Sequence, residues 1–467
     1  MGYDDKSLEE IAAQLRSGGT SVRELIDASA TRHAERNLGA YKTWSGETAS
    51  ATAGSIDWLL KDGYDTGPLM GLPCSVKDLY GVPGLPVFAG TDAQFPDAWQ
   101  RPGPVVSRLM GQLGVIMGKT HTVEMAFGGI GMNPHWPVPV NPWGGGGRIP
   151  GGSSSGAGVS LVEGSALIAL GTDTAGSVRI PASVTGNVGL KITYGRWSCD
   201  GIVPLSSSFD TPGVLCRSVD DLRFVFGALD PAARPVEARP SVSGLRIGLL
   251  DGALAEGVDP DIAELVSGAL RRMEGDGLIL KGADLPQAEP ALALFRKGGL
   301  AASELAAFLQ ADMPESITRL DPLVKARVDA AEGLSATDYL IRRQEFARLQ
   351  AETAATAFKD FDFLACATVA ISPPRLTDLG LPETYGAANM QVLRNTAVAN
   401  LLGLCAITIP VGLDGNDMPV GLMLMAPPLQ EERLIAAALG FEQRLGKGRD
   451  LLGTAPPIER TKREILS

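Results

Sequence analysis

A stretch rich in glycine and serine, residues 151–181, limits the possible folds of this sequence more than any other segment. It reads GGSSSGAG, then the apolar run VSLVEGSALIAL, then GTDTAGSVRIP. A flexible linker would be followed by more polar sequence, whereas Val159 to Leu170 has its apolar residues on one side of a helix that ends at Gly171. We therefore predict a tight turn leading into a packed helix, with glycines where backbone must approach backbone or ligand closely.

A serine-rich turn of this kind can carry a nucleophile, and residues 152–156, GSSSG, fit the G-x-S-x-G elbow of α/β-hydrolases. That elbow needs a strand before it and a histidine base after it. Residues 141–150 are too rich in proline and glycine for a central strand, and the last histidine of the chain is His135. The elbow is therefore disfavoured, although an order in which a histidine precedes Ser177 stays open.

Lysine can replace histidine as the base when burial or a neighbouring cation lowers its pKa, because neutral amine is then present near pH 7. Lys77 is the candidate, since it lies in the apolar, strand-like run GLPCSVKDLYG at 71–81. The other interpretation of any lysine is a solvated surface charge. Periodicity alone does not separate the two for Lys77.

Several motifs of this chain, in this order, resemble those of the amidase signature family of serine amidohydrolases. They are GLPCSVKDLYGV at 71–82, NPW at 141–143, GGSSSGAG at 151–158 and ALGTDTAGSVRIPA at 169–182. The resemblance is strong over about 66–225 and continues more weakly through AITIPVG at 406–412 and MPVGLM at 418–423.

The resemblance implies an α/β fold, a single domain over residues 1–467 in which helices cover both faces of a mixed central sheet (α/β/α). An N-terminal helical arm at 1–65 precedes the signature core at 66–225. A variable helical cap is expected at 258–360, and residues 361–467 complete the core. The alternation of strand-like and helix-like segments agrees with such layers. In the arm, the capping-box patterns SLEE and SVRE predict helices over 7–17 and 21–35.

Carried over to this sequence, the family's catalytic triad consists of Ser177 as nucleophile, Ser153 as bridging serine after a cis peptide bond, and Lys77 as base. A serine hydroxyl is a weak nucleophile until a partner takes its proton. Lys77, acting through the Ser153 hydroxyl, can take that proton and return it to the leaving nitrogen. Asp173 and Arg179 are expected to pair with each other and brace the turn, with a direct substrate contact as the less favoured role.

The resemblance also places an oxyanion hole in the loop before and at the nucleophile, where backbone N–H groups stabilise the tetrahedral intermediate. Its predicted donors are Thr174, Ala175, Gly176 and Ser177. The chain departs here from the usual Gly-Gly-Ser, because Ala175 stands at the first position. If that position needs positive φ, alanine costs about 1 kcal/mol or a little more, and otherwise the change is harmless.

The segment from residue 121 to 137 is rich in glycine, methionine and aromatic residues, and the corresponding stretch of relatives lines the acyl pocket. The predicted substrate contacts are Met125, Phe127, Met132 and Trp136. Packing of some of them in the core is the alternative. The GGGG run at 144–147 could make the next loop mobile. Neither a metal nor an organic cofactor is expected.

Composition excludes some classes of partner. The net charge of −12 argues against nucleic acid and anionic membranes, which would repel the average surface. The five scattered cysteines, with three histidines, indicate neither a disulfide framework nor a zinc site, and a reducing compartment follows. The N-terminus lacks the apolar run of a secretion signal, so we expect a cytoplasmic protein. A homodimer is a possible assembly.

The expected reaction is hydrolysis of the C–N bond of a small, partly apolar or aryl carboxamide, similar to the substrates of indoleacetamide or mandelamide hydrolases. It would proceed through an acyl-enzyme on serine and release ammonia or an amine. One alternative is the glutaminase (A) subunit of a tRNA-dependent amidotransferase, disfavoured because the stretch at 390–402 lacks an acid. A urea-type substrate such as allophanate, and a silent ligand-binding relative, are the others.

Overall fold

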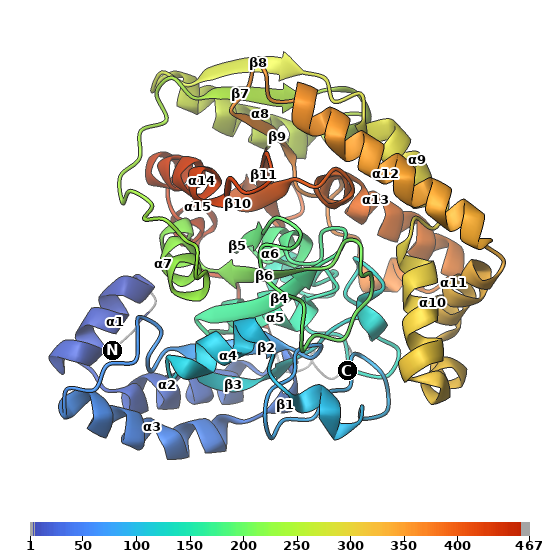
Figure 1. Ribbon diagram of the computed structural model, residues 1–467. Coiled ribbons are helices and arrows are strands. Elements are labelled where there is room, and N and C mark those ends of the chain that lie inside the picture. Colours follow the sequence, from blue (N-terminus) through green and yellow to red (C-terminus); the bar gives the residue numbers. More distant parts are fainter. Residues whose placement is uncertain (1–2, 4, 459–467) are drawn as a thin grey trace.

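The computed structural model describes residue 3 and residues 5–458, which are arranged around one mixed β-sheet (Figure 1). Within these residues the sheet has 11 strands in the order β1-β3-β2-β4-β6-β5-β10-β11-β9-β7-β8. The strands are β1 Tyr41–Trp44, β2 Pro73–Lys77, β3 Val115–Thr120, β4 Ile168–Asp173, β5 Val188–Lys191, β6 Thr211–Cys216, β7 Arg246–Leu250, β8 Ile279–Ala283, β9 Phe363–Ala367, β10 Cys405–Leu413 and β11 Pro419–Ala426. Parallel pairs β3-β2-β4 and β9-β7-β8 flank a central antiparallel region.

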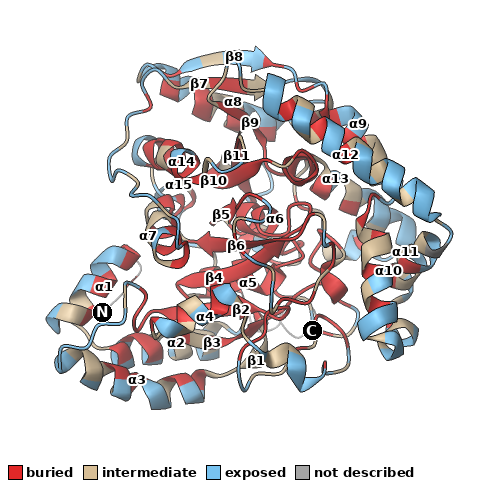
Figure 2. Ribbon diagram, viewed as in Figure 1, coloured by how far each residue is buried: buried red, intermediate tan, exposed pale blue. Residues whose placement is uncertain are grey.

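Helices cover both faces of this sheet, and some form an outer flank. They are α1 Leu8–Ser17, α2 Val22–Arg36, α3 Gly46–Lys61, α4 Pro104–Gly111, α5 Ser155–Glu163, α6 Arg179–Val184, α7 Val219–Leu229, α8 Pro260–Glu274, α9 Ala288–Arg296, α10 Ala301–Asp312, α11 Pro322–Glu332, α12 Ala336–Thr356, α13 Pro382–Leu401, α14 Glu431–Leu445 and α15 Gly448–Leu452. Figure 2 shows the central strands buried, whereas the edge strand β8 and much of α10, α11 and α12 are exposed. No helix of the described residues is long and apolar enough to span a membrane.

Strand β11 shows how the sheet supports two cores, because its side chains alternate between the two faces. Leu422 and Leu424 join the hydrophobic cluster that holds the buried residues of α8 and α14. Met423 and Met425 join the cluster that holds those of α13. All four side chains are buried. The predicted α/β class, with helices on both faces of a mixed sheet, is therefore confirmed.

The N-terminal segment begins as predicted but also contributes a strand. Both capping boxes are present, with Ser7 and Glu10 at the start of α1 and Ser21 and Glu24 at the start of α2. Strand β1 then pairs antiparallel with β3 at one edge of the sheet. Likewise, the segment predicted as a helical cap includes strand β8, which pairs with β7 at the other edge.

The prediction of one helix over Val159–Leu170 was wrong in its boundaries. Helix α5 begins earlier, at Ser155, and ends at Glu163, where Gly164 adopts the left-handed conformation with φ of 80°. Strand β4 then occupies Ile168–Asp173, fully buried between β2 and β6. A short apolar run that is buried on all sides has no periodicity that separates strand from helix.

Two helical glycines provide a test of this packing. At Gly156 in α5, an added Cβ would lie 2.1 Å from the carbonyl oxygen of Ala40 and 2.5 Å from the backbone nitrogen of His121. At Gly268 in α8 it would meet nothing within 4 Å. Gly156→Ala should therefore lower the free energy of unfolding by about 1–3 kcal/mol through overpacking. Gly268→Ala should raise it by up to about 1 kcal/mol through helix propensity.

Denaturant unfolding monitored by circular dichroism measures both changes. The same substitution is made twice, so each variant serves as the control for the other. Equal effects of the two variants would contradict the close backbone contact at Gly156.

Candidate active site

The side chain of Lys77 ends in a buried polar cluster between two strands. Lys77 is the last residue of β2, which pairs in parallel with β4, the strand that supplies Thr172. Lys77 Nζ donates to Ser153 Oγ at 2.7 Å and to Thr172 Oγ1 at 2.8 Å. Lys77 has no exposed surface. Two hydroxyl groups, rather than a carboxylate, therefore hold this lysine in place.

This environment changes the protonation of Lys77. Burial lowers its pKa from 10.5 to about 7, although the carboxylates of Asp210 and Asp173 raise it in part. A large fraction of molecules then carries a neutral amine at neutral pH. Since only the neutral amine accepts a proton, the site meets the requirement for a lysine base.

Ser153 and Ser177 lie on two loops that are joined by their backbones. The Gly152–Ser153 peptide bond is cis. The backbone N–H of Ser154 donates to the carbonyl oxygen of Ser177 at 3.2 Å. Ser153 is fully buried, whereas Ser177 keeps 3% of its surface exposed and lines a cavity. A bound substrate can therefore reach Ser177, while Ser153 is buried beside Lys77.

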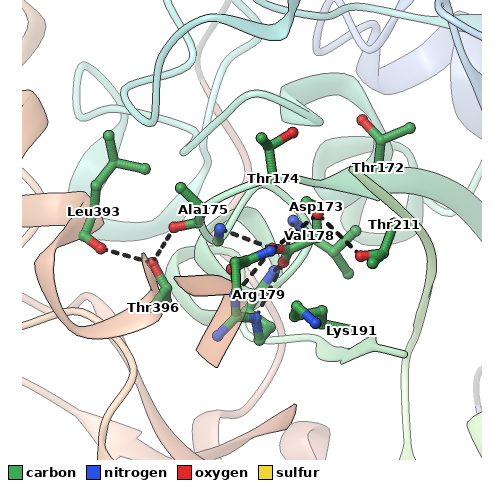
Figure 3. Close-up of polar contacts among 12 residues, drawn as sticks. Thr172, Asp173, Thr174, Ala175, Val178, Arg179, Lys191, Thr211, Leu393 and Thr396 are labelled. Atoms are coloured by element: carbon green, nitrogen blue, oxygen red, sulfur yellow. Dashed lines mark hydrogen bonds and ion pairs between the residues drawn. The ribbon is translucent and has the colours of Figure 1, made fainter. Parts of the chain in front are cut away.

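A buried ion pair organises the loop that carries Ser177 (Figure 3). Arg179 Nη2 donates to Asp173 Oδ1 at 2.9 Å. The same carboxylate accepts the backbone N–H groups of Gly176 at 2.8 Å and Val178 at 3.1 Å. Asn400 Nδ2, from α13, also donates to Asp173 Oδ1 at 2.9 Å. The structure thus pairs Asp173 with Arg179, as predicted. The Asp173 carboxylate accepts hydrogen bonds from both backbone N–H groups and side chains.

The carboxylate of Asp173 stays ionised despite its burial. Burial alone would raise the pKa of Asp173, but the charges of Arg179 and Lys191 and the amide of Asn400 outweigh it and hold the pKa at about 2. Folding therefore stabilises the charged form of Asp173. That stabilisation is present above the ordinary pKa of 3.8 and is lost as the pH falls toward 2.

A second buried carboxylate, Asp210, lies on the other side of the loop. Asp210 accepts hydrogen bonds from the Thr174 hydroxyl and from the backbone N–H groups of Leu205 at 2.8 Å and Ser206 at 2.9 Å. Burial raises the pKa of Asp210 to about 6, against the lowering effects of these bonds and of Lys77. The charge of Asp210 acts in turn on Lys77 and raises the pKa of that lysine.

The predicted oxyanion donors differ in their availability. The Gly176 N–H already donates to Asp173, so this amide belongs to the brace in this conformation, and Thr174, Ala175 and Ser177 remain candidates. Ala175 does not have positive φ, so the alanine fits without backbone strain. Gly176 has φ of 128°, and a Cβ there would lie 2.0 Å from the hydroxyl oxygen of Thr396.

A cavity of about 790 Å³ opens beside Ser177. Its walls are the 126–128 loop, the 174–177 loop, Leu205 and Phe209, the connection from α9 to α10, and parts of α11 and α13. Apolar side chains predominate in the lining, Phe127, Phe209 and Leu393 among them. A small, largely apolar molecule fits such a chamber.

A family model described as Amidase matches residues 21–435. The chain belongs to the amidase family. It is therefore an enzyme of the amide-hydrolysing class, as predicted, and amide C–N bonds are its type of substrate bond.

Named relatives and a solved structure agree with this assignment. The amidase is 56% identical over 457 residues to "2-amino-5-chloromuconic acid deaminase" of Comamonas testosteroni, covering 97% of this chain and 98% of that protein. It is 31% identical to "Mandelamide hydrolase" of Pseudomonas putida, covering 95% and 92% of the two chains. The structure described as "Crystal structure of amidase" superposes with a TM-score of 0.85 at 29% identity, covering 94% of this chain and all of that one.

Only one of the four residues predicted to contact substrate lines the cavity of this amidase. Phe127 does so, whereas Met125 is fully buried in the main hydrophobic core and Met132 packs against the second. Trp136 is buried, and its Nε1 donates to the carbonyl oxygen of Thr91 at 3.1 Å. Met125, Met132 and Trp136 are thus absent from the described lining of this cavity, and their contact with substrate stays a prediction. Met125 has φ of 50°, so the backbone turns here, and simple alternation does not tell which side chains face the cavity.

Sequence reasoning missed two groups at the site. Asp210 lies in the stretch 202–213, which is rich in serine and threonine. No motif or neighbouring charge in the sequence marks it as a functional residue. Arg327 and Tyr385 line the cavity from α11 and α13. No motif surrounds them, because they come from the helical segments outside the signature core. The described residues contain no cluster of three or more histidines, cysteines or acids that could hold a metal ion.

The brace gives a stability prediction. Asp173→Asn removes the charge that compensates the buried guanidinium of Arg179, so we expect a loss of roughly 3–5 kcal/mol in the free energy of unfolding. The matched control is Glu345→Gln, which breaks an exposed pair with Arg348 on α12 and should cost less than about 1 kcal/mol. Urea unfolding at pH 7 measures both, and similar losses would refute a special role for the buried pair.

Proposed function

We propose that this amidase hydrolyses its substrate through an acyl-enzyme on Ser177, with Lys77 as the base and Ser153 as the relay. The observation that carries the proposal is the bond of 2.7 Å from Lys77 Nζ to Ser153 Oγ, at a lysine whose pKa is lowered to about 7. The exposure of Ser177 to the cavity supports its role as nucleophile.

In the proposed acylation, Ser177 Oγ attacks the carbonyl carbon while its proton passes to Ser153 and from Ser153 to Lys77. The N–H groups of Thr174, Ala175 and Ser177 are the proposed donors to the oxyanion. The proton then returns through Ser153 to the leaving nitrogen, and the C–N bond breaks to release ammonia or an amine. Water attacks the resulting ester by the same route and restores Ser177.

Two substrate classes fit the apolar chamber next to Ser177. The first is the small, partly apolar or aryl carboxamide, for which the mandelamide relative is a precedent. The second follows from the relative named for deamination of 2-amino-5-chloromuconic acid. There, water would replace the amino group on an alkenyl carbon of an unsaturated diacid and ammonia would leave, without the ester intermediate of the first class. Both reactions release ammonia, so one assay covers them.

The cellular setting is also a proposal. All five cysteines are free in the structure, which supports a reducing, cytoplasmic compartment. Two further expectations come from the sequence alone: that the protein forms a homodimer and that it does not bind nucleic acid.

Labelling with a fluorophosphonate, followed by intact-mass measurement and peptide mapping, tests the nucleophile and its base. We expect one adduct, on Ser177, and none in Ser177→Ala. Lys77→Met should slow labelling and ammonia release by about three orders of magnitude or more, because the nucleophile loses its base. An adduct on another serine would overturn the assignment.

The matched control for the lysine is Lys191→Met. Lys191 is also buried, and burial lowers its pKa to about 8, but its Nζ donates to the backbone oxygens of Ile192 and Leu404. Although Lys191 adds to the charge that keeps Asp173 ionised, Asp173 retains its pair with Arg179 in this variant, so labelling of Ser177 should stay within about tenfold of the wild type. A loss equal to that of Lys77→Met would mean that any buried lysine of this core is needed, and that Lys77 is not the base.

The pH profile gives an independent test. Since neutral Lys77 is the active form, kcat/KM should fall as the pH drops through about 7. The charge of Asp210 raises the pKa of Lys77, so Asp210→Asn should move this acid limb to lower pH. The exposed control Asp200→Asn should leave the limb unchanged. A limb that stays in place in Asp210→Asn would show that Lys77 does not set it.

A further inference from the structure

The charged residues that the structure describes in the cavity lining are all cations. The cavity is lined by Arg296, Lys297, Arg327 and Arg342, and its described lining includes no aspartate or glutamate. The chain as a whole carries a net charge of −12, so the charge of this cavity wall is opposite in sign to that of the average surface. Cations gathered in a cleft favour an anionic ligand.

Two of these cations are already engaged. Arg296 Nη1 pairs with Glu289 at 2.7 Å, in an exposed contact. Arg342 Nη1 donates to the carbonyl oxygens of Lys297 at 2.9 Å and Gly299 at 3.2 Å, which ties the connection from α9 to α10 to α12. Both arginines therefore have a structural use.

Arg327 differs from them. Among the described residues, no carboxylate lies within ion-pair distance of Arg327, and its Nε donates to the carbonyl oxygen of Leu323 at 3.1 Å. The guanidinium carbon lies 4.2 Å from the centre of the Phe127 ring. Burial lowers the pKa of Arg327, with Tyr385 as a hydrogen-bonding neighbour that offsets this. A guanidinium stays charged in proteins, so this half-buried cation lacks a matched anion.

The nearest acids do not fill that role. Asp321 and Glu124 act on Arg327 only through longer-range charge. Glu124 Oε1 pairs with His135 Nε2 at 2.9 Å, and its Oε2 accepts the backbone N–H of Asp321 at 2.9 Å. The carboxylate of Asp321 accepts the N–H of Leu323 at 2.8 Å and caps α11.

Arg327 and Tyr385 both lie against residues 126–128, a short loop that forms part of the cavity wall. Residues 126–128 line the cavity together with Ser177. Phe127 lies under the guanidinium, and a Cβ on Gly128 would be 2.9 Å from the Tyr385 hydroxyl oxygen. One cation and one hydroxyl donor thus converge from α11 and α13 at a single place in the chamber.

We propose that Arg327 and the Tyr385 hydroxyl bind a carboxylate group of the substrate, so that the natural substrate is a small molecule with a carboxylate at one end and the scissile C–N bond at the other. A planar guanidinium and a hydroxyl match the two oxygens of a carboxylate. The apolar side chains beside Ser177 would contact the carbon chain between the two groups. Only the scissile C–N bond is taken from the proposed function. The carboxylate site is inferred separately, from the geometry of Arg327 and Tyr385.

The test compares two amides with the same scissile group. One is the monoamide of hexanedioic acid, which carries a carboxylate, and the other is its neutral methyl ester. Ammonia release should favour the anionic amide in the wild type. Arg327→Gln should lower kcat/KM for the anionic amide by about 10- to 100-fold, the range for a hydrogen bond to a charged group, and change the neutral amide far less. Arg327→Lys should recover part of the loss.

The matched control is Arg296→Gln, which removes a cation of the same cavity that already has a partner. This variant should keep the preference for the anionic amide. A loss of preference equal to that of Arg327→Gln would mean that the general positive field, rather than Arg327, selects the substrate, and would overturn the proposal.

Binding measured without turnover separates this proposal from the proposed function. In the Ser177→Ala background, calorimetry with hexanedioate and with muconate should show binding that Arg327→Gln weakens at least tenfold. Binding that depends on Arg327, together with no hydrolysis of either amide, would reject the function and keep the carboxylate site. Equal hydrolysis of both amides with no diacid binding would reject the carboxylate site and keep the function.

Discussion

The catalytic loop depends on one buried carboxylate. Asp173 ends strand β4, and its oxygens accept backbone N–H groups of the residues around Ser177 as well as the guanidinium of Arg179. A short loop without such bonds would have many conformations. The ionised carboxylate fixes it by hydrogen bonds that are stronger for being charge-assisted and shielded from water. The position of Ser177, the proposed nucleophile, is thus set by electrostatics at the end of a strand.

The same core holds Lys77, the proposed base, by a different principle. Lys77 is bonded to hydroxyl groups, so no adjacent carboxylate holds its proton in place. Asp173 and Asp210 act on it from further away and limit how far burial lowers its pKa. Asp173 is matched by Arg179, while no cation of the described residues is bonded to Asp210. Asp173 therefore stays ionised and holds its loop, whereas Lys77 can release and take up a proton.

Sequence alone predicted the parts of this site that lie in continuous motifs. Lys77, Ser153 and Ser177 each lie in a short continuous motif, in which neighbouring glycines and apolar residues mark the position. The wall of the cavity was less predictable, since positive φ at Met125 and Ala126 turns the backbone and sends Met125 into the core. Strand β4 was hidden in an apolar run that is buried on every side. Arg327 acquires its importance only from the fold, which brings α11 over Phe127.

Helix α13 runs from the cavity to the brace as one rigid element. Tyr385, Asn389 and Leu393 line the cavity, while Thr396 donates to the carbonyl oxygen of Ala175 and Asn400 to Asp173. A substitution that displaces this helix at the substrate end would also displace the loop of the nucleophile. Helix α11 has no such second attachment to the catalytic loop among the contacts described above. Substrate range can therefore diversify in evolution through α11 at little cost to catalysis, whereas α13 is bound to change slowly.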